Sequence, residues 1–179
     1  VRNPVYREAA TSFAGGDGSE ESPYEISSAE ELQYLSGLLS DEENRSSEYR
    51  NQHYILTSDI SLNDTSDYAG WSEAGPEYDW RPIGVAAAFG GVFDGNGHTI
   101  SGLYINADME DDNTAGARKN GGLFAQIFGG TVKNLNLTEV YIEVSGNALD
   151  TGAIAGSASK AEISDCTVDG LVIGYEYYT

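Results

Sequence analysis

The sequence predicts an all-β protein, a right-handed parallel β-helix (solenoid) of about three to four coils with an N-terminal capping α-helix. Short apolar stretches recur at intervals of about thirty residues, a length typical of one solenoid coil. Within each stretch the apolar side chains alternate with period two, as in half-buried strands. Strands that recur at near-constant length, with no hairpin turns between them, pair in parallel with their copies one coil later. The right-handed sense follows the general preference of parallel crossovers.

The capping helix is predicted over residues 29–39, ahead of the first strands. Ser28 followed by Glu31 forms a capping box, a common start of a helix. Four leucines then fall on one helical face: Leu32, Leu35, Leu38 and Leu39. We expect this face to cover the N-terminal end of the coils, because an open end exposes apolar side chains and unpaired strand edges. Binding of a partner by the helix is the alternative.

The coils are predicted from one diverged segment, 54–62, and three units that align with one another, 100–105, 132–137 and 163–168. In this alignment Leu103, Leu135 and Cys166 are equivalent, 32 and 31 residues apart. The residue before each one is of a type that accepts left-handed backbone, so a sharp bend is expected at three positions. These positions are Gly102, Asn134 and Asp165. Further along, the pair Val140 and Ile142 is equated with Leu171 and Ile173.

The domain organisation expected is one folded unit. Residues 1–52 form the N-terminal segment with its capping helix, and residues 53–179 form the β-helix repeats, which we expect to continue beyond residue 179. No predicted helix follows the C-terminal coil, where Tyr175, Tyr177 and Tyr178 fall. This end is therefore expected to pair with further coils or to mediate end-to-end self-association.

The composition excludes several kinds of partner. The 9 Lys and Arg against 29 Asp and Glu give a net charge of −20 at pH 7, which repels nucleic acid backbones. No apolar run is long enough to cross a bilayer. The single cysteine, Cys166, can form no internal disulfide, and its place among the repeats predicts a buried apolar side chain rather than a reactive thiol.

Two acidic insertions interrupt the repeat and are the candidate binding surfaces, because loops on a rigid scaffold often carry binding residues. Residues 63–80 are acidic and aromatic, and residues 106–120 carry carboxylates where the next unit has the apolar strand 140–144. The candidate ligand contacts are Tyr68, Trp71, Tyr78, Asp108, Asp111 and Asp112. Exposed rings could stack on sugars while carboxylates bind hydroxyl groups. Alternatively the rings pack against the flank of the coils, an interpretation that we favour most for Trp80.

No catalytic residue can be assigned. With 29 acidic residues, the carboxylate pairs that glycoside hydrolysis needs arise by chance. Neither His53 nor His98 has a nucleophile or a second histidine at a spacing typical of catalysis or zinc binding. No metal site and no cofactor are expected, except that calcium stays open because oxygen ligands are abundant.

An ordered series of motifs runs through the chain. It consists of FAGGDG at 13–18, PYEI at 23–26, LTSDI at 56–60, WRPIG at 80–84, FDGNGHTISGL at 93–103 and GLF at 122–124. Together these motifs resemble the GLUG-motif proteins, and the resemblance covers roughly residues 11–173, with GAI at 152–154 in place of the signature. The resemblance implies a parallel β-helix from a large bacterial surface or secreted protein, often an adhesin. Similar repeats accompany the peptidase domain of some immunoglobulin A proteases, although this chain has no His-Glu-x-x-His motif.

The sequence therefore predicts a non-enzymatic module, an adhesin or a spacer, of an extracellular or bacterial cell-surface protein. It would contact a host or neighbouring-cell protein or glycan through its loops. Two alternatives stay open: an accessory substrate-binding region of a secreted immunoglobulin protease, and a β-helix enzyme that degrades polysaccharides.

Overall fold

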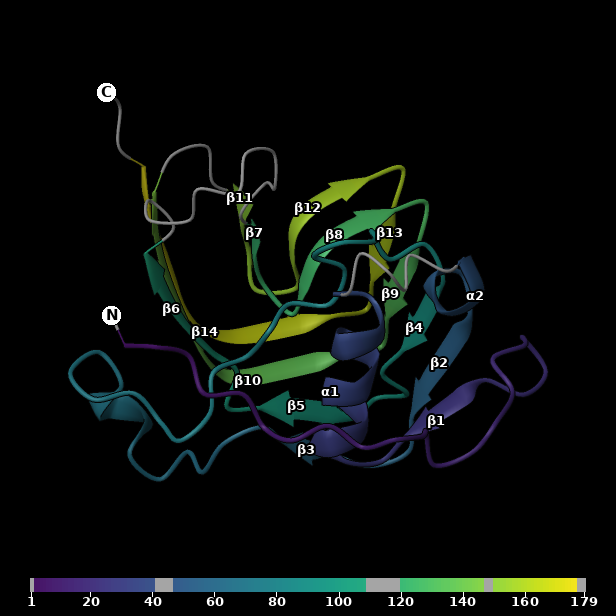
Figure 1. Cartoon of the computed structure of the whole chain (residues 1–179), viewed down its shortest axis with the longest axis horizontal. Coiled ribbons are helices and arrows are strands. Elements are labelled where there is room, and N and C mark those ends of the chain that lie inside the picture. The colour runs from purple at the N-terminus through teal and green to yellow at the C-terminus, as the bar shows by residue number, and fades with distance from the viewer. Residues whose placement is uncertain (1, 41–46, 109–119, 147–149, 177–179) are drawn as a thin grey trace.

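The computed structural model describes residues 2–40, 47–108, 120–146 and 150–176. These residues form a mostly β structure whose strands pair in parallel and whose sheets curl around a shared apolar core (Figure 1). The predicted β class and parallel pairing are confirmed. The sheets differ in length and are not those of a regular solenoid.

The first five-stranded sheet has the order β1-β2-β4-β9-β13. Its strands are β1 (Tyr24–Ile26), β2 (His53–Leu56), β4 (Val92–Asp94), β9 (Thr131–Lys133) and β13 (Glu162–Ser164). One inward-facing position runs across this sheet, since Tyr54 pairs with Phe93, Phe93 with Val132, and Val132 with Ile163. Tyr54, Phe93 and Val132 are buried, whereas Ile163 at the edge is exposed.

The second sheet has the order β14-β10-β5-β3, and β6 also pairs with β10. Its strands are β3 (Ile60–Ser61), β5 (Thr99–Ser101), β6 (Tyr104–Asp108), β10 (Asn136–Gly146) and β14 (Thr167–Glu176). Two shorter sheets pair β7 with β11 and β8 with β12. These four strands are β7 (Asn120–Gly121), β8 (Phe124–Phe128), β11 (Asp150–Thr151) and β12 (Ala155–Ser159).

Helix α1 (Ala29–Leu38) lies across the opening between the two larger sheets (Figure 1). The Ser28 side chain accepts a hydrogen bond from the Glu31 amide, as the capping box predicts, while the Glu31 carboxylate binds the amide of Ser27 instead of Ser28. The predicted apolar face is confirmed for three of its four leucines, since Leu32, Leu35 and Leu39 are fully buried in the core, whereas Leu38 is only half-buried. Burying this face also covers apolar side chains of the curled sheets.

The register between strands differs from the sequence alignment in the first aligned unit. Ile100 pairs with Leu137 and Tyr104 with Tyr141, an offset of 37 residues. The predicted offset of 32 is therefore wrong here by five residues. Four residues, 95–98, connect β4 to β5, whereas only residues 134–135 connect β9 to β10. Both 92–94 and 99–101 are strands with an apolar centre, so the periodicity alone does not show which one matches β9.

A second register difference lies between β10 and β14. Val140 pairs with Gly170 and Ile142 with Val172, one residue before the predicted partners Leu171 and Ile173. The register shifts between Leu137 and Val140, where β10 has one more residue than β14. Such a bulge leaves no clear trace in an apolar pattern.

The predicted bends are confirmed by the backbone. Gly102, Asn134 and Asp165 all have positive φ, at 78°, 54° and 52°. By strand register, however, Asn134 and Asp165 turn at one corner, and Gly102 corresponds to Glu139, whose φ is 45°. The residue types therefore predicted the positive φ values correctly, but the placement of Gly102 at the same corner as Asn134 and Asp165 was wrong.

The C-terminal layer has an apolar exposed face. The edge strands β13 and β14 expose several large apolar residues: Ile163, Val168, Leu171, Val172 and Tyr175. Cys166 is partly buried against the core, where burial raises the pKa of its thiol. The raised pKa lowers the thiolate fraction, but the side chain is only partly buried, whereas the sequence predicted a buried one.

Candidate functional site

The insertion 63–80 is an ordered loop whose two ends are tied together. The Asn63 side chain donates to the Tyr78 carbonyl at 2.8 Å and accepts from the Tyr78 amide at 2.9 Å. The side-chain nitrogen of Asn63, Nδ2, also donates to the Gly102 carbonyl at 3.0 Å. Because Asn63 is 4% exposed, these bonds are shielded from water, and the loop is held on the sheet that contains β3 and β5.

Trp71 is buried beneath this loop, and the expectation that its ring is exposed is wrong. Trp71 is 1% exposed and forms a separate apolar cluster with Tyr104 of β6 and Tyr141 of β10. Its indole nitrogen donates to Asp67 at 3.0 Å, and its ring meets Tyr104 edge-on with centroids 5.8 Å apart. The alternative, in which the ring packs against the flank, describes Trp71 correctly.

Tyr68, on the short 3-10 helix η1 (Tyr68–Gly70), packs against the same cluster. Its hydroxyl donates to the Val140 carbonyl at 2.7 Å. Burial raises the pKa of this hydroxyl, which keeps it neutral and able to donate. Tyr68 and Trp71 therefore act together as an anchor of the loop.

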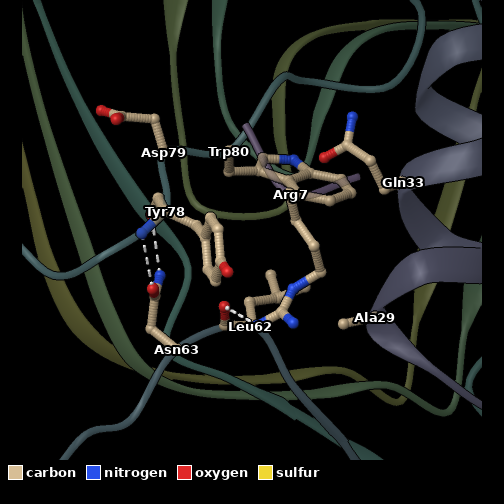
Figure 2. Close-up of a pocket in the computed structure, with 8 residues that line it drawn as sticks. All are labelled: Arg7, Ala29, Gln33, Leu62, Asn63, Tyr78, Asp79 and Trp80. Atoms are coloured by element: carbon tan, nitrogen blue, oxygen red, sulfur yellow. Dashed lines mark hydrogen bonds between the residues drawn. The ribbon is translucent and has the colours of Figure 1, made fainter. Parts of the chain in front are cut away.

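Tyr78 lies on another side of the loop, beneath the guanidinium of Arg7. The Arg7 guanidinium carbon is 4.4 Å from the Tyr78 ring centroid, a cation–π contact. Arg7 also donates to Glu30 of α1 and to the Leu62 carbonyl, at 3.0 Å each. Figure 2 shows the ring and the guanidinium together in a small pocket beside α1. Arg7 thus joins the N-terminal segment to the loop.

An acidic hollow of about 230 Å³ opens beside Tyr78. This acidic hollow is lined by Arg7, Asn63, Asp64, Ser66, Asp67, Pro76, Glu77 and Tyr78. Asp64, Asp67 and Glu77 are exposed there. Hydrogen bonds from Ser66 lower the pKa of Asp64, so this carboxylate is ionised at neutral pH. The hollow therefore offers hydrogen-bond acceptors and negative charge to a ligand that carries hydroxyl or amino groups.

The remaining predicted contacts lie elsewhere or outside the described residues. Asp108 is at the end of β6 and lines a different hollow of about 290 Å³, next to Arg2 and Tyr6 of the N-terminal segment. Asp111 and Asp112 lie outside the described residues. The six candidates are therefore not brought to one place: two form the anchor, one lines the acidic hollow, and Asp108 lies apart.

Strand β6 also corrects the prediction for the insertion 106–120. Its first residues fill the place opposite the apolar strand of the next unit, where Ile105 pairs with Ile142 and Ala107 with Val144. The repeat is thus continued up to Asp108, although acidic residues follow it. Trp80 is buried and donates to the Leu123 carbonyl at 3.1 Å, which confirms its predicted packing.

His98 is held by a carboxylate next to β3. His98 Nδ1 is 3.1 Å from the carboxylate of Asp59, and that carboxylate also accepts from the Thr99 amide at 2.9 Å. Both bonds join β5 to the residue just before β3, a structural role. Within the described ranges, no group of three or more His, Cys, Asp or Glu side chains is placed to hold a metal ion.

Sequence reasoning missed Arg7 and Asn63, the residues that fix Tyr78. An arginine in an otherwise acidic, Tyr-rich chain is a usable signal, since such residues often stack on aromatic rings. Asn63 gives no such signal, because its partners are backbone atoms distant in sequence.

The comparisons with known proteins give two relatives. The chain is 33% identical over 171 residues to halomucin of Haloquadratum walsbyi. It is 35% identical over 147 residues to a protein of Evansella cellulosilytica whose name describes a Gly-rich membrane protein. These alignments cover 93% and 81% of the chain, but the chain spans only 2% and 14% of the relatives' own lengths.

Other comparisons are negative. No protein-family model matches the chain, and no solved structure matches it significantly. Among the described residues there is no helix with the length and apolar character needed to span a membrane.

Proposed function

We propose that the chain is a non-enzymatic binding or spacer module of a larger extracellular or cell-surface protein, built as a short right-handed parallel β-helix. The parallel pairing of strands one repeat apart supports this architecture, as does the position of α1 against the curl. Support for a large surface protein comes from the alignment with a small part of halomucin and of the Gly-rich protein.

We also propose membership of the GLUG-motif proteins of bacterial surfaces, on the basis of the motifs quoted above. The packing of one motif, residues 122–124, gives it a physical meaning. Leu123 and Phe124 are fully buried, and a Cβ at Gly122 would lie 2.7 Å from the Gly152 carbonyl of the next repeat. Such a motif would keep neighbouring repeats close while filling the core between them.

The observation that carries the binding proposal is the acidic hollow on an anchored loop. Asn63 ties the loop at its base, and the cluster around Trp71 holds it from beneath, so the exposed carboxylates are presented by a rigid support. Rigid presentation lowers the entropy lost on binding. The ligand proposed is a host or neighbouring-cell protein or glycan that places hydroxyl or amino donors in the hollow.

The proposal is tested with paired variants on arrays of glycans and host surface proteins. The double variant Asp64→Asn, Glu77→Gln removes two carboxylates from the hollow. Its control is Glu8→Gln, Glu20→Gln, which removes two exposed carboxylates that line neither this hollow nor another one in the described part of the chain.

We expect the parent chain and the control to bind the same array members, and the Asp64→Asn, Glu77→Gln variant to bind them at least tenfold more weakly, as the loss of a charged hydrogen bond implies. Equal binding by all three chains would show that the acidic hollow is not the binding site.

Self-association through the C-terminal layer is a further part of the proposal, supported by the exposed Ile163, Val168 and Leu171.

A further inference from the structure

One further hollow, which shares no residue with the acidic hollow, has aromatic walls. It measures about 210 Å³ and lies between the N-terminal segment, β1, α1 and α2 (Ser47–Arg50). Figure 1 shows β1 and α2 on the same side of the molecule, flanking β2. We call it the aromatic hollow; its lining is Thr11, Ser12, Phe13, Gly15, Gly16, Tyr24, Tyr34 and Tyr49.

The four rings of this hollow are held by one another while remaining partly exposed. The Phe13 centroid lies 4.7 Å from that of Tyr24 and 5.0 Å from that of Tyr34, and Tyr24 is 6.0 Å from Tyr49. Buried Tyr54 supports them, 5.6 Å from Tyr24. The cluster therefore presents fixed aromatic surface to solvent.

Two carboxylates give this hollow a negative potential. The charges of Glu48 and Asp17 add to burial in raising the pKa of the Tyr24 hydroxyl, and Glu48 acts in the same way on Tyr49. Both carboxylates are themselves exposed. Ring faces and carboxylates attract the same kind of ligand, a positively charged one.

Cations of this chain already use aromatic rings in the same way. Four of them lie over a ring: Arg2 over Tyr104 at 5.5 Å, Arg7 over Tyr78 at 4.4 Å, Arg81 over Tyr6 at 4.5 Å and Lys160 over Phe128 at 5.4 Å. None of these four lies over a ring of the aromatic hollow. The aromatic hollow thus has ring faces and nearby carboxylates that suit a cation, and none of these four cations occupies it.

We propose that the aromatic hollow binds an organic cation, such as the guanidinium of an arginine side chain of a partner or a small quaternary ammonium compound. A neutral sugar would also stack on the rings and donate hydroxyl hydrogen bonds to carboxylates, but it would gain nothing from the net charge of −20. The charge therefore favours the cation. This site is independent of the acidic hollow and of its proposed ligand.

The experiment is an NMR titration of the whole chain with ¹³C-labelled tyrosine rings, at constant ionic strength. The probes are choline, N-acetyl-arginine amide and 3,3-dimethyl-1-butanol, a neutral compound of the same shape as choline. We expect saturable shifts of Tyr24, Tyr34 and Tyr49 with at least one cation, and binding about tenfold weaker or absent with the neutral compound. Tighter binding of the arginine derivative indicates a protein partner, and tighter binding of choline a small ammonium ligand.

Variants distinguish specific cation binding from nonspecific apolar contact with the tyrosine rings. Tyr34→Phe keeps the ring and should keep the affinity, whereas Tyr34→Leu should weaken cation binding about tenfold. The pair Asp17→Asn, Glu48→Gln should also weaken it, and Asp64→Asn, Glu77→Gln should not. Equal affinity for choline and its neutral counterpart, or no shift at these tyrosines with either cation, overturns the proposal.

Discussion

The side-chain amide of Asn63 pairs with both backbone polar groups of Tyr78, fifteen residues away, and with the carbonyl of Gly102 on the neighbouring strand connection. One buried side chain thus satisfies three backbone groups and closes the loop that carries the acidic hollow. The loop is an integral part of the structure rather than a free insertion.

Replacing Asn63 should destabilise the whole chain. In Asn63→Ala, the Tyr78 amide and the carbonyls of Tyr78 and Gly102 lose a partner in a place with little access to water, and we expect a loss of about 3 kcal/mol of unfolding free energy. Urea unfolding followed by circular dichroism measures it. Asn3→Ala, on an exposed residue, is the control and should change the free energy by less than about 0.5 kcal/mol. A similarly small effect for Asn63→Ala would show that the loop closes without this side chain.

Replacing Trp71 should lower the free energy of unfolding, because its indole is buried. Trp71→Ala removes a fully buried indole from its contacts with Tyr104 and Tyr68, for which we expect a cost of about 4 kcal/mol. Because both Trp71 and Trp80 are buried, acrylamide, a neutral quencher that the net charge of −20 does not repel, should quench the tryptophan fluorescence of the native parent chain poorly. Strong quenching that disappears in Trp71→Ala would mean that the indole is exposed.

Stability should fall at alkaline pH, and Tyr54 should contribute to the fall. Burial raises the pKa of Tyr54 far above the value of 10.0 that applies to an accessible tyrosine. The folded state therefore keeps a proton that the unfolded chain releases, so the stabilisation is complete below pH 10 and declines as the pH rises further. The decline is at most about 1.4 kcal/mol per pH unit for one group.

The variant Tyr54→Phe isolates this contribution. It loses the hydrogen bond from the Tyr54 hydroxyl to the Tyr49 carbonyl, so we expect it to be about 1 kcal/mol less stable at neutral pH. Its free energy of unfolding should then decrease less steeply than that of the parent between about pH 10 and pH 11. Parallel pH profiles for the two chains would contradict the assignment.

Glu139 holds a backbone conformation that suits glycine better. Its φ of 45° matches the position of Gly102 in the preceding strand connection, and left-handed backbone costs an ordinary residue about 1 kcal/mol. We expect Glu139→Gly to raise the unfolding midpoint in urea slightly or leave it unchanged. Thr138→Gly, one residue earlier and outside the set of positive φ values, should lower it. If Glu139→Gly lowers the unfolding midpoint as much as Thr138→Gly does, the backbone at Glu139 is not strained.

The sequence was informative about residue types and less so about alignment. Positive φ was predicted correctly at Asn134 and Asp165 because few side chains tolerate it. The partner of Ile100 was predicted wrongly because strands of three residues carry too little pattern to fix a register when the connection between them varies from two residues to four. Register depends on contacts between residues about thirty positions apart, which local periodicity does not encode.

The candidate site shows the same limit. An aromatic residue in an acidic insertion can be exposed or buried, and Trp71 is buried because Tyr104 and Tyr141 on neighbouring strands provide its cluster. The exposure of Asp64 and Glu77 in the acidic hollow could be predicted from the sequence, because carboxylates are seldom buried. The aromatic hollow could not be predicted, because Phe13, Tyr24 and Tyr49 come from three separate segments.

The central claim is that strands stack in parallel with the observed register, and disulfide trapping tests it most directly. In a Cys166→Ala background, the pair Thr99→Cys, Asn136→Cys joins register partners of β5 and β10. The comparison pair Tyr104→Cys, Asn136→Cys joins the positions that the sequence alignment equates, 32 residues apart. After mild oxidation, alkylation and mass spectrometry should find no free thiol in the first pair and two in the second. A disulfide in the second pair and not in the first would contradict the register, and free thiols in the first would contradict the stacking of these strands.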